Sequence, residues 1–286
     1  MMEAFEVMRW PLLACLLLPG LLVYLGLHIV RREIIFVDLA LAQVAALGIC
    51  LAILLGHDSH DWQTTAWSAG LTLAGAAVLT LTRPSGKHVP QEALIGIVYV
   101  VAAAAGILLL SRSPEGNEEL RRTLVGEVLL VQPGEILRTA GLFTAVGLVH
   151  VVFRRQFLLL SFDPERGRKE GLRLWLWDFL FYGLFGLAVT SFVRMGGVLL
   201  VFSYLIIPAV SARLWAVSLP AHLVIGWVVA TGASVAGLYG SYRLDLPTGA
   251  AVVCALGLSL VLAAVFQIPA SRSNAWLESF MQRRKP

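Results

Sequence analysis

Runs of about 20 apolar residues recur along this chain, and they restrict it to very few folds. A helix needs about 20 largely apolar residues to cross a bilayer. Only 14% of the 286 residues are charged, whereas soluble domains average about 25%. Nine stretches have the required length, at roughly 10–30, 34–55, 62–82, 92–111, 136–153, 174–193, 196–216, 221–241 and 247–268. The sequence therefore predicts an all-α, polytopic membrane helix bundle of about nine spans, with eight as the alternative count.

The fifth and seventh stretches, at 136–153 and 196–216, are less clearly full spans than the others. Residues 111–132 are polar and then briefly apolar, which favours an external or interfacial segment before the fifth stretch. The turn at 193–197 is so short that a re-entrant pair of half-helices is an alternative to two full spans. We expect all the spans to form a single transmembrane domain over residues 1–286.

The distribution of basic residues predicts which loops face the cytoplasm. The longest charged interruption, Arg154–Arg173, begins and ends with basic residues, and such loops mark the cytoplasmic side. With this loop inside and nine spans, the N-terminus lies outside and the C-terminus lies in the cytoplasm. Of the 22 Lys and Arg residues, fifteen then fall inside and seven outside. This asymmetry also explains the net charge of +4 without a nucleic-acid partner.

Within that loop the residue order predicts a short capped helix. Asp163 can act as its N-cap, Pro164 as its first residue, Glu165 as a favourable charge on the helix dipole and Gly171 as the residue that ends it. Two readings follow from these features. The helix is either a docking surface for a cytoplasmic partner or part of a solvated basic loop.

Sequence motifs for covalent chemistry are missing. The chain has no GxxxxGK[ST], HExxH or GxSxG motif, and Cys15, Cys50 and Cys254 form no CxxC pair. Any energy from ATP must therefore come from another chain. An intramembrane enzyme is disfavoured for the same reason. A secondary transporter remains an alternative, although it would need ion-coupling polar groups at mid-membrane, and charge within these spans is sparse.

Asp38 and Asp178 lie inside predicted spans, where charge is expensive and is usually paired or functional. Asp38 could bind substrate, or it could pair with Arg31 or Arg32 at the end of the preceding span. Asp178 lies close to Arg173, so we interpret it as a structural partner.

A polar turn on the external side concentrates nitrogen and oxygen ligands. His57, Asp58, His60 and Asp61 follow one another where an incoming metal ion would arrive. Residues three apart could chelate a cation if the turn were helical. The turn is either a transient metal site, with His57 and His60 as ligands, or a plain solvated loop.

Five stretches, spread over almost the whole chain, resemble the metal-type permeases of ATP-binding-cassette importers. That family takes up zinc, manganese or iron with the help of a binding protein. The matching stretches are RREIIFVDLALAQVAALG from Arg31, QEALIGIVYVVAAAAG from Gln91, LLLSFDPERGRKEGL from Leu158, GGVLLVFSYLIIPAVSARL from Gly196 and LDLPTGAAVV from Leu244.

The resemblance implies a mechanism and a set of partners. The segment from Ser161 to Gly171 would be the coupling helix that docks on a separate cytoplasmic ATPase. Phe162, Asp163, Pro164 and Glu165 would make the contacts. Two copies of the permease would form a homodimer in the plasma membrane and would receive a divalent metal ion from an extracytoplasmic binding protein. No permanent cofactor is implied, because the partner subunit uses the ATP.

The second span departs from the family pattern. Members of the family usually carry an Asp and a His one helical turn apart, on one face of that span. Here Gln43 takes the place of the His, and Asp38 precedes it by five residues instead of four. A neutral amide oxygen is a weaker zinc ligand than imidazole. The resemblance still implies that Asp38 and Gln43 lie on the substrate path, and a non-metal cargo is the alternative.

Overall fold

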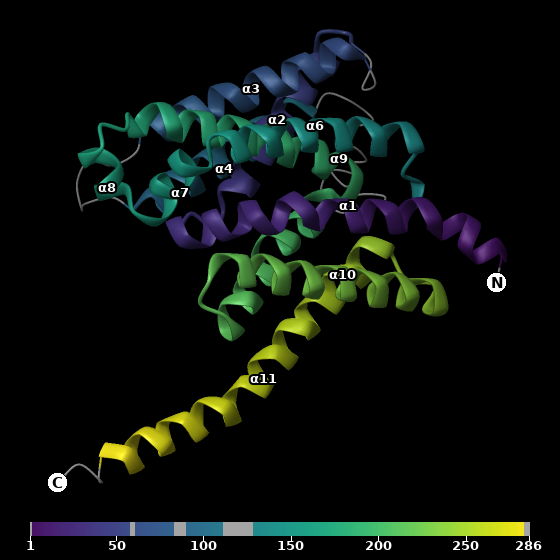
Figure 1. Cartoon of the computed structure of the whole chain (residues 1–286). Coiled ribbons are helices and arrows are strands. Elements are labelled where there is room, and N and C mark those ends of the chain that lie inside the picture. The colour runs from purple at the N-terminus through teal and green to yellow at the C-terminus, as the bar shows by residue number, and fades with distance from the viewer. Residues whose placement is uncertain (1, 58–60, 83–89, 111–127, 283–286) are drawn as a thin grey trace.

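The computed structural model describes residues 2–57, 61–82, 90–110 and 128–282, and these residues fold into helices without any strand (Figure 1). The helices are α1 (Met2–Arg32), α2 (Val37–Leu54), α3 (Trp62–Leu81), α4 (Gln91–Leu110), the 3-10 turn η1 (Val128–Leu130), α6 (Pro133–Val152), α7 (Arg154–Phe162), α8 (Pro164–Lys169), α9 (Leu174–Trp215), α10 (Leu219–Leu244) and α11 (Thr248–Gln282).

The predicted membrane bundle is confirmed. Nine segments of the described residues are long and apolar enough to cross a membrane, and each falls within a few residues of a predicted span. The sixth and seventh are Leu174–Val193 and Met195–Trp215, so each is long enough for a full crossing and need not be a half-helix. Most ends differ from the prediction by only a few residues because a membrane fixes the length of the apolar run.

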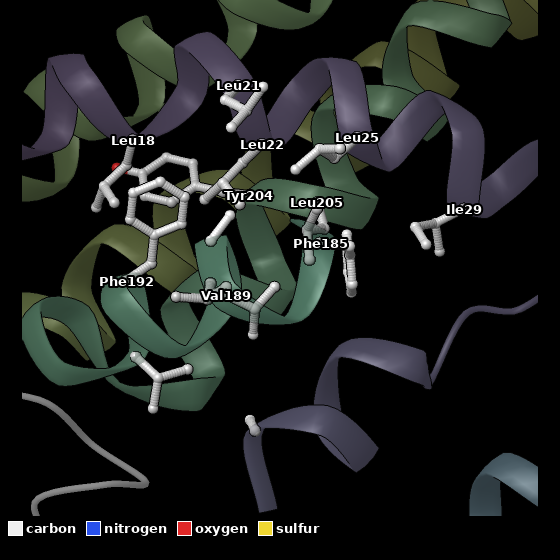
Figure 2. Close-up of a cluster of buried hydrophobic side chains, with 14 of the residues drawn as sticks. Leu18, Leu21, Leu22, Leu25, Ile29, Phe185, Val189, Phe192, Tyr204 and Leu205 are labelled. Atoms are coloured by element: carbon white, nitrogen blue, oxygen red, sulfur yellow. The ribbon is translucent and has the colours of Figure 1, made fainter. Parts of the chain in front are cut away.

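Helix α9 consists of two arms that meet at Gly197. This residue has φ 74° and ψ 163°, a conformation that is almost restricted to glycine. Side chains of both arms gather against α1 (Figure 2), namely Phe185 and Phe192 of the first arm and Tyr204 and Leu205 of the second. The pair forms the centre of the bundle, since α9 contacts α1, α2, α3, α10 and α11. The C-terminal part of α11 extends away from the other helices (Figure 1).

Helix α1 buries one face against both arms of α9 (Figure 2). Its residues Leu18, Leu22, Leu25 and Ile29 recur at the three- and four-residue spacing that places side chains on one helix face, and all are fully buried. Lipid is as apolar as these side chains. Their contribution therefore comes mainly from close van der Waals packing and much less from removal of water.

Gly26 allows the closest approach between α1 and α9. A Cβ atom placed on Gly26 would lie 1.9 Å from the carbonyl oxygen of Leu205, which is backbone and cannot rotate away. Gly20, on the same helix, has only the end of the Phe143 ring nearby, at 3.9 Å. The two glycines therefore differ in whether the fold requires them.

We expect Gly26→Ala to destabilise the protein by about 3 kcal/mol, because α1 must move away from the second arm of α9. Gly20→Ala is the matched control and should unfold like the wild type or slightly later, since alanine favours the helix. Thermal unfolding of both variants in detergent tests this. Equal melting temperatures for the two variants would contradict the assigned contact.

Candidate functional site

The predicted short helix in the charged loop forms, and its cap is the predicted one. Asp163 is the single residue between α7 and α8. Its carboxylate accepts a hydrogen bond from the backbone N–H of Arg166 at 3.1 Å. Pro164 is the first residue of α8. Gly171 adopts a φ of 80°, and the next N–H, of Leu172, donates to the carbonyl of Gly167 at 2.9 Å. This is a left-handed glycine ending of the kind that stops helices.

The segment expected to be one helix from 161 to 171 is in fact a corner. Ser161 and Phe162 end α7, whereas α8 covers only Pro164–Lys169. Two exposed ion pairs span the corner, because Glu170 accepts from Arg155 at 2.8 Å and from Arg166 at 2.9 Å. A hollow of about 400 Å³ lies beside them and is lined by Arg155, Gln156, Leu159, Glu170 and Leu172. We call residues 154–171 the α7–α8 corner.

The two sides of the α7–α8 corner have different chemistry. Asp163, Glu165, Arg168 and Lys169 are exposed. On the other side Phe157 is fully buried, stacked on the ring of His150 of α6 with a centroid distance of 4.2 Å. The corner therefore presents a charged outer face while its inner face is packed into the bundle.

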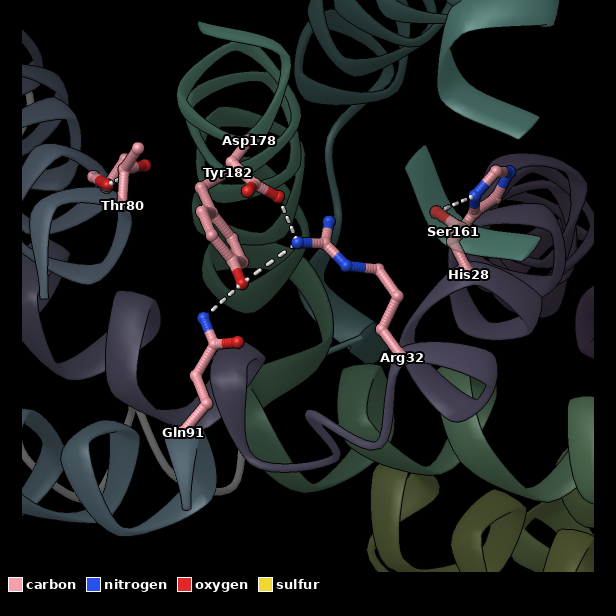
Figure 3. Close-up of polar contacts among 8 residues, drawn as sticks. His28, Arg32, Thr80, Gln91, Ser161, Asp178 and Tyr182 are labelled. Carbon is pink, nitrogen blue, oxygen red and sulfur yellow. Dashed lines mark hydrogen bonds and ion pairs between the residues drawn. The ribbon is translucent and has the colours of Figure 1, made fainter. Parts of the chain in front are cut away.

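The corner also contacts the end of α1. The hydroxyl of Ser161 lies 2.7 Å from Nδ1 of His28, and both residues are buried (Figure 3). The guanidinium of Arg31 lies over the ring of Phe162, 5.7 Å from its centroid. Three helices thus hold the inner face, since Phe157 also contacts Trp177 of α9.

A second buried polar group joins three helices nearby (Figure 3). Arg32, at the end of α1, forms an ion pair with Asp178 and donates to the hydroxyl of Tyr182 at 3.2 Å, both on α9. Gln91, the first residue of α4, donates to the same hydroxyl at 2.7 Å. The Arg32 and Asp178 side chains are only 5% and 1% exposed. We call these four residues the Arg32 cluster.

The Arg32 cluster corrects two sequence-based expectations. Asp178 was expected to be a structural partner, and it is one, but its partner is Arg32 and not the neighbouring Arg173. For the same reason Arg32 does not neutralise Asp38. Arg32 pairs with the carboxylate that helix packing brings close to it, and not with the one that is nearer in the sequence.

Asp38 and Gln43 are both buried but do not form a pair. They are 2% and 7% exposed, and both lie on α2. Five residues turn a helix by about 500°, so their side chains leave α2 about 140° apart. Oδ1 of Asp38 has no hydrogen-bond partner within the described residues. In that part of the chain there is also no group of three or more His, Cys, Asp or Glu residues able to hold a metal ion.

The polar turn before α3 is only partly described. His57 is half-buried just after α2, whereas Asp58 and His60 lie outside the described residues. Asp61 is the residue that precedes α3. A metal site formed by His57 and His60 therefore stays a prediction.

Sequence reasoning missed the Arg32 cluster and the contact between His28 and Ser161. A lone carboxylate in a span, such as Asp178, signals that a cation must be near. The sequence does not say which one, because Arg32 is 146 positions away. His28 carried no comparable signal, since a single histidine at a helix end is usually a packing residue.

Comparison with known proteins identifies the family. The sequence profile of the ABC 3 transport family matches residues 4–267, and the chain belongs to this family. The chain is 27% identical over 248 residues to the manganese import system permease protein ScaB of Streptococcus gordonii, with 86% of each chain covered. It is also 27% identical over 266 residues to the chelated iron transport system membrane protein YfeD of Yersinia pestis, covering 92% of this chain and 86% of that protein.

A solved structure has the same fold. The chain superimposes on PsaBC from Streptococcus pneumoniae in complex with Fab with a TM-score of 0.77 and 22% identity, covering 92% of this chain and 93% of the other. The chain is therefore a multi-pass membrane protein built like a permease of this transporter class.

We expect Asp178→Asn to destabilise the protein by about 3–5 kcal/mol, because it leaves the buried guanidinium of Arg32 without its countercharge. Asp245→Asn is the matched control, since Asp245 is exposed and Asn tolerates its left-handed backbone. Removing both charges, by Arg32→Met with Asp178→Leu, should recover part of the loss. Unfolding curves in detergent measure these changes in stability. Equal curves for Asp178→Asn and Asp245→Asn would contradict the expected loss.

The α7–α8 corner should loosen at low pH. The hydrogen bond from Arg166, together with the positive charges of Arg155 and Arg166, lowers the pKa of Glu170 below its ordinary value of 4.5. A carboxylate with a lowered pKa stabilises the fold at higher pH, and this contribution is lost as the pH falls through the folded value. Amide exchange protection of α8 should therefore drop below about pH 4.5. Glu170→Gln should show weaker protection already at neutral pH and little further change; an identical pH profile in the two proteins would refute this role.

Proposed function

We propose that this chain is the membrane permease subunit of an ATP-binding-cassette importer for a divalent metal ion, coupled to a separate cytoplasmic ATPase. Its membership of the ABC 3 transport family supports the class, and relatives named for manganese and chelated iron transport support a metal cargo. The observation that carries the coupling role is the α7–α8 corner, whose outer face is charged while its inner face is packed into three helices.

In this proposal the α7–α8 corner is the docking surface for the ATPase. Asp163 and Glu165 lie on its exposed face, and Pro164 starts the helix between them. Phe162 and Ser161 face the bundle, so they would fix the corner to the permease more than contact the ATPase. Gly171 would keep the helix short. Closure of the ATPase would push or pull this corner, and the permease itself would carry out no covalent chemistry.

The sidedness follows from the same proposal. The end of α1 contacts the α7–α8 corner, and the starts of α4 and α9 join it through the Arg32 cluster. All of these ends would be cytoplasmic, which agrees with their predicted positions from the basic residues. The N-terminus would then lie outside and the C-terminus inside the plasma membrane.

For the substrate path we propose Asp38 and Gln43 on α2. Asp38 has an unsatisfied carboxylate oxygen at a buried position, which is a costly arrangement unless a cation or water satisfies it during the cycle. Because Gln43 points to another side of α2, the two would act in succession and not as one chelate. His57 and His60 would offer a transient site where metal enters. A second copy of the chain and an extracytoplasmic binding protein would complete the transporter over a single permease domain of residues 1–286.

Uptake of manganese, zinc and iron tests this function in cells that carry the permease with its ATPase. We expect Asp38→Asn to abolish metal uptake and Gln43→His to shift the preference toward zinc, because imidazole is the better zinc ligand. Asp163→Ala should remove uptake through loss of the cap, while protein levels in the membrane stay normal. Asp245→Asn serves as the control.

Three other outcomes have distinct meanings. Uptake that persists without any ATPase would favour a secondary transporter and would overturn the proposal. ATPase stimulation without uptake of any of the three metals would keep the importer architecture but assign another cargo. Full uptake by Asp38→Asn would remove Asp38 from the path.

A further inference from the structure

One turn of α1 is connected to two separate parts of the molecule. His28 contacts Ser161 of the α7–α8 corner, and Arg32, four residues later on the same helix face, holds Asp178 and Tyr182 of α9. Tyr182 in turn accepts from Gln91 of α4. The last turn of α1 therefore contacts the corner through His28. Through Arg32 it contacts α9 and, by way of Tyr182, α4 (Figure 3).

The contact between His28 and Ser161 is shielded from water. His28 has no exposed surface, and its ring packs against Tyr24 at 4.7 Å, Phe162 at 5.7 Å and Phe181 at 5.8 Å between ring centroids. Apolar contacts are not directional, whereas a hydrogen bond restricts both the distance and the direction between two helices. In surroundings of low polarity it is also stronger than at a wet surface.

We infer that His28 is a positioning residue of the transport cycle: its hydrogen bond with Ser161 transmits movement of the α7–α8 corner to the end of α1. From there the Arg32 cluster passes the movement on to Tyr182 of α9 and through it to α4, in addition to the direct contact of the corner with α9. The inference rests on the proposed function, because it assumes that an ATPase moves the corner. It adds the route by which that movement reaches the helices beside the substrate path.

His150 is a second buried histidine, but it forms no hydrogen bond that joins two helices within the described residues. It lies in the same aromatic group, since its ring stacks on Phe157 and meets Tyr24 edge-on at 5.5 Å. Its Nδ1, however, contacts the carbonyl of Val146 in its own helix, at 3.0 Å. His150→Phe is therefore a matched control for His28→Phe.

A purely structural role and a transmitting role give different results in a double variant. Ser161→Ala alone leaves a buried polar atom of His28 unsatisfied, which destabilises a protein more than removal of both partners does. Combining His28→Phe with Ser161→Ala should therefore restore stability. It cannot restore the directional link between the two helices. His28→Asn should keep the link, because an amide atom takes the position of Nδ1.

The experiment uses the complete transporter, with its ATPase and binding protein, in vesicles loaded with ATP and supplied with manganese. It measures manganese ions moved per ATP hydrolysed, together with the melting temperature. We expect Ser161→Ala and His28→Phe each to lower this ratio roughly fivefold, the effect of one net hydrogen bond on an equilibrium. The double variant should keep the low ratio although its melting temperature returns toward that of the wild type. His28→Asn and His150→Phe should retain the wild-type ratio.

The inference is overturned if the ratio follows the melting temperature through the whole series, because the contact would then be structural only. It is equally overturned if His150→Phe lowers the ratio as much as His28→Phe. If one single variant does not fold, the other single variant and His28→Asn still decide between these results. Failure of the proposed function looks different, since the wild-type transporter itself would then show no transport that depends on ATP.

Discussion

The buried ion pair between Arg32 and Asp178 is the interaction on which the arrangement of the spans most depends. Neither charge can face lipid alone, because an unpaired charge inside a membrane is costly. The end of α1 must therefore stay beside the start of α9, and Tyr182 then brings in the start of α4. A single cation thus fixes which helix ends share one side of the membrane. These are the ends that the distribution of basic residues independently assigns to the cytoplasm.

Away from this cluster, close packing holds the helices together. The face of α1 that carries Leu18, Leu22 and Leu25 fits both arms of α9, and Gly26 lets the backbones meet. Such contacts depend on shape and, unlike hydrogen bonds, have no preferred direction. The polar contacts of His28 and Arg32 lie at one end of the same interface. The interface of α1 thus combines close apolar packing along its length with directional polar contacts at one end.

The sequence predicted those features that depend on local physics. Span positions follow from the thickness of a bilayer, and the cap at Asp163 follows from the order of four residues, so both are confirmed. The helix Arg154–Phe162, which precedes this cap, was missed because the sequence analysis treated the whole charged stretch from Arg154 as a loop. The partner of Asp178 could not be predicted, because ion pairing between distant segments depends on how the helices pack. Asp38 and Gln43 lie on different sides of α2 because they are five residues apart, and this follows from helix geometry alone.

The sharp turn at Gly197 has a consequence for how the protein enters the membrane. Only Arg194 separates the two apolar spans of α9, so the chain between them is too short to form a loop of its own. We therefore expect the two arms to enter the membrane together, as one helical hairpin. The surfaces that α1 and α10 contact on α9 would then become available in one step of assembly.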